Sequence, residues 1–100
     1  MSQKKVDKLR REVEKLRRKG DIKERELRGL AEAVGRRRGT RGKEPTWVSE
    51  QFPARPLSIP AQRVVNRYTA LGILDDLEQD LDEIEATLEK EQRGEPNGRR

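Results

Sequence analysis

The amino-acid sequence predicts a helix-rich α+β fold with a small antiparallel sheet. Apolar residues recur with helical spacing near both ends of the 100-residue chain, and the middle holds two short segments of β-branched, leucine or aromatic residues. Prolines lie around those segments, so the strands must be short or at a sheet edge. The length favours one domain, over residues 1–93, with a flexible tail at 94–100.

The first predicted helix covers residues 3–19. Its apolar side chains follow a 3-4-3 spacing and share one face, whereas Lys and Arg crowd the opposite face. Gly20 is typical of the residue that follows a helix. The apolar face consists of Val6, Leu9, Val13 and Leu16.

The second predicted helix covers residues 22–34. Asp21 is a suitable N-cap, and Glu24 follows it with the spacing of a capping box. Gly35 ends the helix. The side chains expected to face the core are Ile22, Leu27, Leu30, Ala31 and Val34.

The middle of the chain predicts the sheet. Residues 36–43 are basic, contain glycine and lack apolar periodicity, so the residue pattern alone places no regular element there. Strands are predicted at 46–48 and 57–59, joined by a connection from 49 to 56.

The last predicted helix covers residues 70–92, with Thr69 as its N-cap. Its apolar stripe has the 3-4-3-4 spacing of a heptad pattern. The stripe could pack in antiparallel fashion against residues 6–16, whose charge is opposite, or it could mediate self-association or bind a partner helix. The stripe consists of Leu74, Leu77, Leu81, Ile84 and Leu88.

Composition excludes several kinds of chemistry. The chain has no Cys and no His, so it offers neither a thiolate nor the usual near-neutral general base. The acidic residues Asp75, Asp76 and Asp80 match no calcium loop, and we interpret them as a solvated helix face. We therefore expect no cofactor and no metal. We also expect a cytoplasmic protein, because no signal peptide or membrane span is evident.

Charge is strongly segregated along the chain. Residues 1–43 carry 17 Lys and Arg against 7 Asp and Glu, whereas residues 75–92 carry nine acidic residues against Lys90. The densest cationic stretch lies just before the first predicted strand. Because Lys and Arg neutralise phosphates and an aromatic ring can stack on a base, this stretch predicts RNA binding. The predicted RNA-binding residues are Arg36, Arg37, Arg38, Arg41, Lys43 and Trp47.

Two alternatives exist for this basic segment. It could be a solvated loop, or it could pair with the protein's own acidic helix.

Glu44 is the candidate for acid–base catalysis, because it follows basic residues and precedes a predicted strand; it could equally balance the charge of Lys43.

Three segments resemble the HicA toxins of bacterial toxin–antitoxin systems. Residues 57–62 and 67–77 are similar to the family's strand, its Pro-x-His ending and the helix that follows, and Arg41-Gly42-Lys43-Glu44 lies where the family has a Gly-Ser-His signature. The resemblance covers about residues 22–80; residues 1–20 and 81–93 extend it. It implies a double-stranded-RNA-binding-like fold, mRNA endoribonuclease (hydrolase) activity and a HicB-like antitoxin partner.

The departures from the HicA pattern concern catalysis. Glu44 lies where the family's catalytic His would be, and Gln62 lies where its second His usually is. The sequence therefore predicts an RNA-binding, HicA-like toxin whose ribonuclease activity is weakened or lost. The alternative is a protein–protein interaction module that acts through its charged amphipathic helices. No helix-turn-helix pattern favours a DNA-binding regulator.

Overall fold

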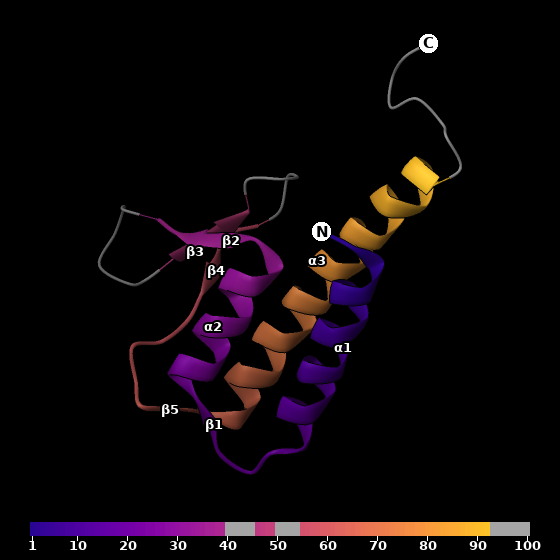
Figure 1. Ribbon diagram of the computed structural model, residues 1–100. Helices are drawn as coiled ribbons and strands as arrows, with labels where there is room; N and C mark the ends of the chain where they lie inside the picture. Colours follow the sequence, from indigo (N-terminus) through magenta and orange to yellow (C-terminus); the bar gives the residue numbers. More distant parts are fainter. Residues whose placement is uncertain (40–45, 50–54, 93–100) are drawn as a thin grey trace.

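The computed structural model describes residues 1–39, 46–49 and 55–92, and its elements confirm the predicted α+β class (Figure 1). The helices of these residues are α1 (Gln3–Arg18), α2 (Glu24–Val34) and α3 (Arg67–Gln92). The strands are β1 (Ile22–Lys23), β2 (Arg36–Arg38), β3 (Thr46–Ser49), β4 (Leu57–Ser58) and β5 (Val64–Val65).

Helix α1 forms as predicted and packs along α3. The hydroxyl of Ser2 accepts a hydrogen bond from the backbone N–H of Lys5 at 3.2 Å and caps the helix. The helix ends at Arg18, one residue before the predicted end. Its apolar face is buried, and α1 runs antiparallel to α3 (Figure 1). The antiparallel pairing within the chain, one of the alternatives for the leucine stripe, is therefore what the structure shows.

The region before α2 differs from the prediction. Ile22 does not begin the helix but forms β1, where it pairs in antiparallel fashion with Val65 of β5. The helix begins at Glu24, and the carboxylate of Glu26 accepts the backbone N–H of Lys23 at 3.0 Å. The predicted Asp21–Glu24 capping box is wrong because the buried Ile22 takes an extended conformation, which moves the helix start by two residues.

Helix α2 ends where predicted and leads directly into the sheet. Gly35 has φ 112°, a left-handed conformation that glycine adopts at low cost. Strand β2 follows immediately and is the first strand of an antiparallel sheet with the order β2–β3–β4. Arg38 lies opposite Trp47, and Trp47 lies opposite Leu57. Strands β3 and β4 confirm the predicted segments at 46–48 and 57–59.

Helix α3 begins earlier than predicted. The side-chain oxygen of Asn66 accepts the backbone N–H groups of Tyr68 at 2.9 Å and Thr69 at 3.4 Å. Asn66 is therefore the N-cap, and Thr69 lies inside the first turn instead of capping it. The Asn66 side chain satisfies these free N–H groups, so the helix starts at Arg67.

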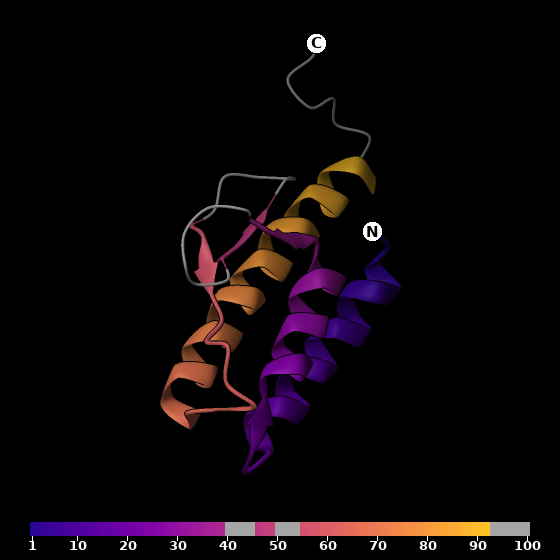
Figure 2. The same cartoon turned by 90° about the vertical axis from the view of Figure 1, so that its left-hand side faces the viewer.

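In the part of the chain that the structure describes, a hydrophobic core joins α1, α2 and α3 to strands from both sheets. Three leucines of the predicted stripe, Leu74, Leu77 and Leu81, are fully buried in it, and Leu88 is partly buried at its edge. Figures 1 and 2 place the β2–β3–β4 sheet beside α2 and α3, whereas α1 lies away from it. The molecule therefore offers two separate outer surfaces, one on the sheet and one on α1.

Candidate nucleic-acid interface

The three consecutive arginines of β2 occupy different environments. Arg36 is buried, with a side chain only 3% exposed, whereas Arg37 and Arg38 are exposed. The alternation of side chains along a strand explains why Arg37 lies on the sheet face opposite to Arg36. Arg38 shares the face of Arg36 but is the last residue of the strand.

Arg36 forms a bidentate ion pair with Asp80 of α3. Its Nε donates to Oδ2 at 2.5 Å, and one Nη donates to Oδ1 at 3.0 Å. The other Nη donates to the backbone carbonyls of Trp47 at 2.9 Å and Arg55 at 2.8 Å. One guanidinium group thus ties β2 to β3, to the segment before β4 and to α3. Arg36 is therefore part of the interior and not of a phosphate-binding surface.

The prediction of a solvated acidic face is wrong for Asp80. Its side chain is 4% exposed, although Asp75 on the same helix is exposed as expected. The spacing in the sequence carried a signal, because Asp80 continues a 4-3-4 series of buried positions. That series is Ile73, Leu77, Asp80 and Ile84.

Trp47 also lies in the core. Stacking on a base would require an exposed ring. The residue is 2% exposed, between Arg38 on β2 and Leu57 on β4. Its indole Nε1 is buried, and in the part of the chain that the structure describes it has no hydrogen-bond partner.

Three other predicted site residues, Arg41, Lys43 and Glu44, lie outside the described residues, as do most of the predicted connection at 49–56 and the tail at 94–100.

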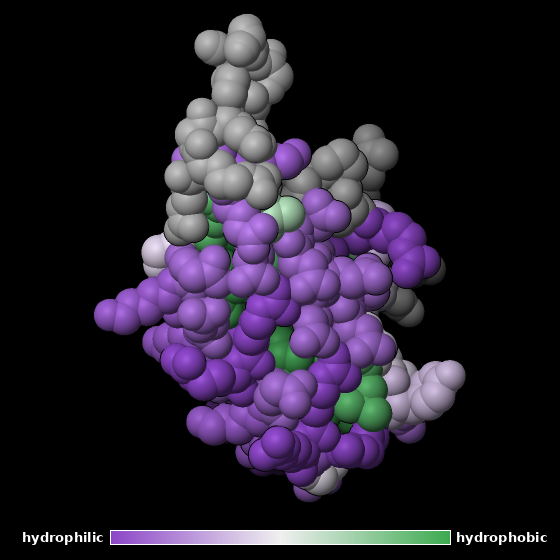
Figure 3. All heavy atoms as spheres, turned by 90° about the vertical axis from the view of Figure 1, so that its right-hand side faces the viewer, coloured by the Kyte–Doolittle hydropathy of each residue, from purple (hydrophilic) through white to green (hydrophobic). Residues whose placement is uncertain are grey.

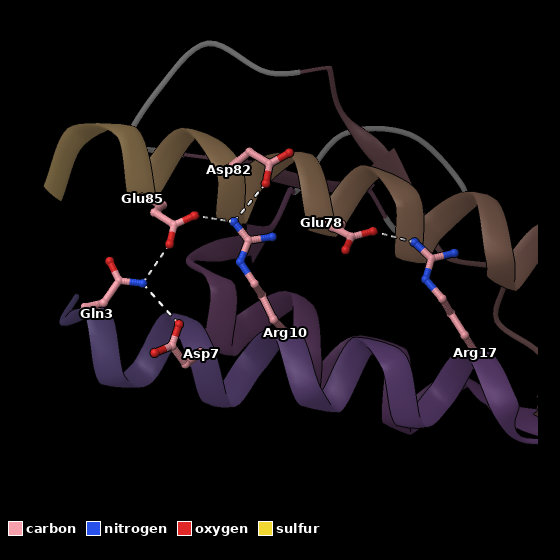
Figure 4. A network of polar contacts seen from close by, with 7 residues as sticks. All are labelled: Gln3, Asp7, Arg10, Arg17, Glu78, Asp82 and Glu85. Atoms are coloured by element: carbon pink, nitrogen blue, oxygen red, sulfur yellow. Dashed lines mark hydrogen bonds and ion pairs between the residues drawn. The ribbon is translucent and has the colours of Figure 1, made fainter. Parts of the chain in front are cut away.

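The α1–α3 interface holds a second set of ion pairs, shown in Figure 4. Arg10 contacts the carboxylates of Asp82 at 2.8 Å and Glu85 at 2.7 Å. The hydrogen bond to Asp82, with Glu85 beside it, raises the pKa of Arg10 above its ordinary value against the opposing effect of burial. The amide of Gln3 donates to the same Glu85 at 2.7 Å.

Arg17 repeats this arrangement two turns further along α1. Its guanidinium contacts Asp75 and Glu78, each at 2.7 Å. The hydrogen bond to Asp75, followed by that to Glu78, raises the pKa of Arg17 although burial acts in the opposite direction. The acidic surface of α3 is thus neutralised in part by cations from α1.

Arg67 and Lys19 join the helix ends beside the β1–β5 pair, away from the β2–β3–β4 sheet (Figure 1). The guanidinium of Arg67 donates to the carbonyls of Lys19 at 2.5 Å and Arg17 at 2.9 Å, which satisfies free acceptors at the end of α1. The ammonium of Lys19 contacts Glu26 at 2.6 Å. Sequence reasoning missed Arg67, because nothing local marks a residue that caps a distant helix.

Comparisons with known proteins add no family to the α+β class that the fold defines. No family model, no curated protein and no solved structure matches this chain. In the described ranges, no group of three or more acidic side chains is placed to hold a metal ion. Among the same residues, no helix is long and apolar enough to cross a membrane.

Proposed function

We propose that this protein binds RNA through the basic edge of its three-stranded sheet. The observation that carries the proposal is the difference in burial along β2. The buried Arg36 fixes the strand, and Arg37 and Arg38 are exposed beside it. Exposed guanidinium groups on a strand suit phosphate contacts, because they face solvent and can form bidentate, charge-assisted hydrogen bonds with phosphate oxygens. Arg41 and Lys43 follow in sequence and would extend the cationic surface.

The chain order supports an RNA-binding domain of the HicA-like type. Helix α2, strands β2, β3 and β4, and helix α3 follow one another, as a helix–sheet–helix domain of the double-stranded-RNA-binding kind would require. A toxin of this type would act on mRNA and be neutralised by a HicB-like protein. We assign binding rather than rapid cleavage, because Glu44 replaces the catalytic His and an ordinary carboxylate is a weak base at pH 7.

RNA binding is tested with Arg37 and Arg38 replaced by alanine together. Fluorescence anisotropy with a labelled single-stranded RNA should show a salt slope flattened by about 1.4 on a log–log plot, at about 0.7 per lost phosphate contact. The matched control replaces two exposed cations outside the sheet, Lys5 and Lys90, by alanine and should leave the slope nearly unchanged. Equal slopes for wild type and the Arg37/Arg38 variant would refute the assignment of this surface.

Catalysis is tested separately at Glu44. The wild-type protein should cleave RNA slowly or not at all, and Glu44→His should raise the cleavage rate near neutral pH. Glu44→Gln should remove any residual activity and leave RNA affinity unchanged or slightly higher, because a negative charge is lost. Rapid cleavage by the Glu44→Gln variant would exclude Glu44 as the catalytic residue.

The protein–protein alternative has less support from the geometry. Self-association through the leucine stripe needs an exposed apolar face, yet Leu74, Leu77 and Leu81 are fully buried against the chain's own helices. Sedimentation velocity at several protein concentrations distinguishes the two functions. A concentration-dependent dimer that persists in high salt, without RNA binding, would favour the interaction module.

A further inference from the structure

Helix α1 presents a row of five cations on the side that faces away from the core. Their spacing is 4-3-4-3, so they fall within about 80° of the helix circumference at 100° per residue. All five residues are exposed. The acidic residues of α1 lie outside this sector, with Asp7 and Glu14 on one flank and Glu12 on the other. This α1 cationic row consists of Lys4, Lys8, Arg11, Lys15 and Arg18.

The fold itself gains little from this row. Arg10 and Arg17 on the neighbouring flank each contact two carboxylates of α3. Among the described residues, the contact of a row member with an acidic side chain is that of Lys15 with Glu12, at 4.0 Å, where the lysine is 76% exposed. Within the described ranges, the ion pairs between the acidic helix α3 and α1 involve Arg10 and Arg17 and no member of the row.

Two further effects make the row unfavourable for the helix alone. Lysines and arginines three or four positions apart repel one another. The first turn of α1 contains no acidic residue, and Lys4 lies there, where the helix dipole disfavours a positive charge, whereas Lys15 and Arg18 lie in the last turn, where the dipole favours one. The repulsion along the row is better explained by a ligand that supplies negative charge than by a role in stability.

We propose that the α1 cationic row binds the phosphate backbone of a nucleic-acid duplex. From Lys4 to Arg18 the row extends about 21 Å at 1.5 Å per residue, and the Cβ atoms of successive members are about 5–6 Å apart. A shallow depression of about 450 Å³ lies beside the C-terminal half of the row, lined by its members Arg11, Lys15 and Arg18 and by Arg10 and Glu14 of the adjacent flank. A straight, rigid row suits a duplex, whose phosphates are held in a regular array.

The absence of aromatic residues from α1 favours a duplex over a single strand. Single-stranded nucleic acid is commonly held by stacking its bases on aromatic rings, and α1 has none. A surface of cations alone contacts phosphates without reading bases. The row should therefore bind duplexes of different sequence equally well. This inference rests on the proposed RNA binding for the class of ligand, and it adds a second surface remote from β2.

A membrane surface fits the row less well. Basic amphipathic helices bind lipid by inserting an apolar face, but the apolar face of α1 is already buried in the core, with Val6 and Val13 fully buried. The side of the molecule that carries α1 and α3 is covered mostly by hydrophilic side chains, with small hydrophobic areas between them (Figure 3). Among the described residues seen in this view, no continuous apolar surface accompanies the cations.

The test replaces the three central cations of the row, Lys8, Arg11 and Lys15, by glutamine. Binding to an RNA duplex of about 20 base pairs, long enough for a small RNA-binding domain, is followed by anisotropy at several salt concentrations. The log–log slope should flatten by about two to three, at about 0.9 per phosphate contact. The control carries the same charge change off the row, as Lys5, Arg63 and Lys90 replaced by glutamine, and its slope should change by less than one.

Each outcome bears on the inference independently of the Arg37/Arg38 result. A flattened slope for the row variant alone supports it, even if the sheet edge proves inactive. Equal flattening in the control overturns it, because net charge would then explain the binding. An unchanged slope also overturns it, while a positive Arg37/Arg38 result would keep the proposed RNA binding. Row-dependent binding to phosphatidylserine vesicles without duplex binding would assign the surface to lipid instead.

A stability measurement separates a binding role from a structural one. Since the substitutions remove repulsion and glutamine is a good helix former, the row variant should melt at the same temperature as wild type or higher. Reduced duplex binding together with an unchanged or raised Tm supports the inference. Loss of helicity and binding together would show that the cations serve the fold, and would overturn it.

Discussion

The two sides of helix α3 use the same Arg–carboxylate chemistry in opposite environments. On the sheet side, Arg36 and Asp80 are 3% and 4% exposed and are joined by two hydrogen bonds. On the α1 side, Arg17 contacts Glu78 and Asp75, whose side chains are 37% and 66% exposed. The difference between the two sides is therefore solvent, not contact distance.

This difference determines what each ion pair contributes. Water screens the α1-side pairs, so each contributes little, although together they favour the antiparallel alignment of α1 and α3. Removing Arg36 and Asp80 from water costs free energy that only close, well-satisfied geometry can offset. The carbonyls of Trp47 and Arg55 complete that geometry. The buried pair therefore specifies where the sheet lies on α3, whereas the exposed pairs add modest stability.

The largest effect should come from breaking the buried pair. Asp80→Ala leaves the Arg36 guanidinium buried without its counter-charge, which should lower the free energy of unfolding by about 3–5 kcal/mol. Urea denaturation followed by circular dichroism measures this change. The control is Asp82→Ala, which removes an exposed carboxylate from the same helix and should cost less than about 1 kcal/mol. Equal effects of the two substitutions would mean that burial does not distinguish the pairs.

A double variant tests whether the buried pair is a source of stability or of specificity. Arg36→Met combined with Asp80→Leu removes both charges and keeps apolar volume, so urea denaturation should show recovery of part of the loss caused by Asp80→Ala; the carbonyls of Trp47 and Arg55, which lose their Arg36 donor, limit the recovery. A double variant as unstable as the single one would show that the pair itself stabilises the fold.

The second largest effect concerns the apolar contacts between the two ion-pair sets. Leu81 is fully buried between α3 and the rest of the core, and Leu81→Ala should cost about 2–4 kcal/mol, as core truncations do. Leu88→Ala, at a partly buried position on the same stripe, should cost clearly less. Denaturant unfolding that shows no change for Leu81→Ala would contradict the packing of the stripe within the chain.

Apolar periodicity was sufficient to predict the helices, and short β-branched, leucine or aromatic segments between prolines predicted two of the strands. Apolar spacing located α1, the body of α2 and α3, because burial of one helical face leaves a repeat that is visible in the chain. Strand β2 left no such repeat, since Arg-Arg-Arg shows no alternation between apolar and polar residues. It becomes a strand because Gly35 turns the chain and because Arg36 forms an ion pair with Asp80, 44 residues away in the sequence.

The predicted site was divided by this long-range contact. From the sequence, Arg36, Arg37 and Arg38 formed one basic cluster, and only the position of Asp80 shows that Arg36 belongs to the interior. Trp47 behaved likewise: an aromatic residue beside cations suggests stacking, but its cross-strand neighbour Leu57 keeps it in the core. Local composition indicates which chemistry is present, whereas pairing across the fold determines which side chains can use it.

A smaller effect is expected on the α1 side of α3. Arg17→Gln removes contacts with Asp75 and Glu78, and it should lower the free energy of unfolding by about 0.2–1 kcal/mol at low salt. In 1 M NaCl, where the Debye length is about 3 Å, the difference from wild type should largely disappear. The loss caused by Asp80→Ala should persist in the same salt. A salt-independent loss for Arg17→Gln would show that the α1-side pairs behave as buried ones.

The smallest effect concerns Glu26, a carboxylate whose exposure lies between those of Asp80 and Asp75. Burial raises the pKa of Glu26, but the hydrogen bonds from Lys19 and from the backbone N–H of Lys23 outweigh burial, so the pKa is lower than its ordinary value of 4.5. The unfolded state therefore binds more protons, and the stabilisation is present above pH 4.5 and is lost as pH falls through the folded-state pKa.

Glu26→Gln keeps an acceptor for Lys23 but loses the charge, so it should cost less than about 1 kcal/mol at pH 7. In thermal melts from pH 7 to about pH 3, where an unperturbed Glu is protonated, the difference from wild type should shrink toward zero. Glu83→Gln, which removes an exposed charge from α3, is the control; a difference that grows toward low pH only for Glu26→Gln would reverse the sign and show that burial dominates at this site.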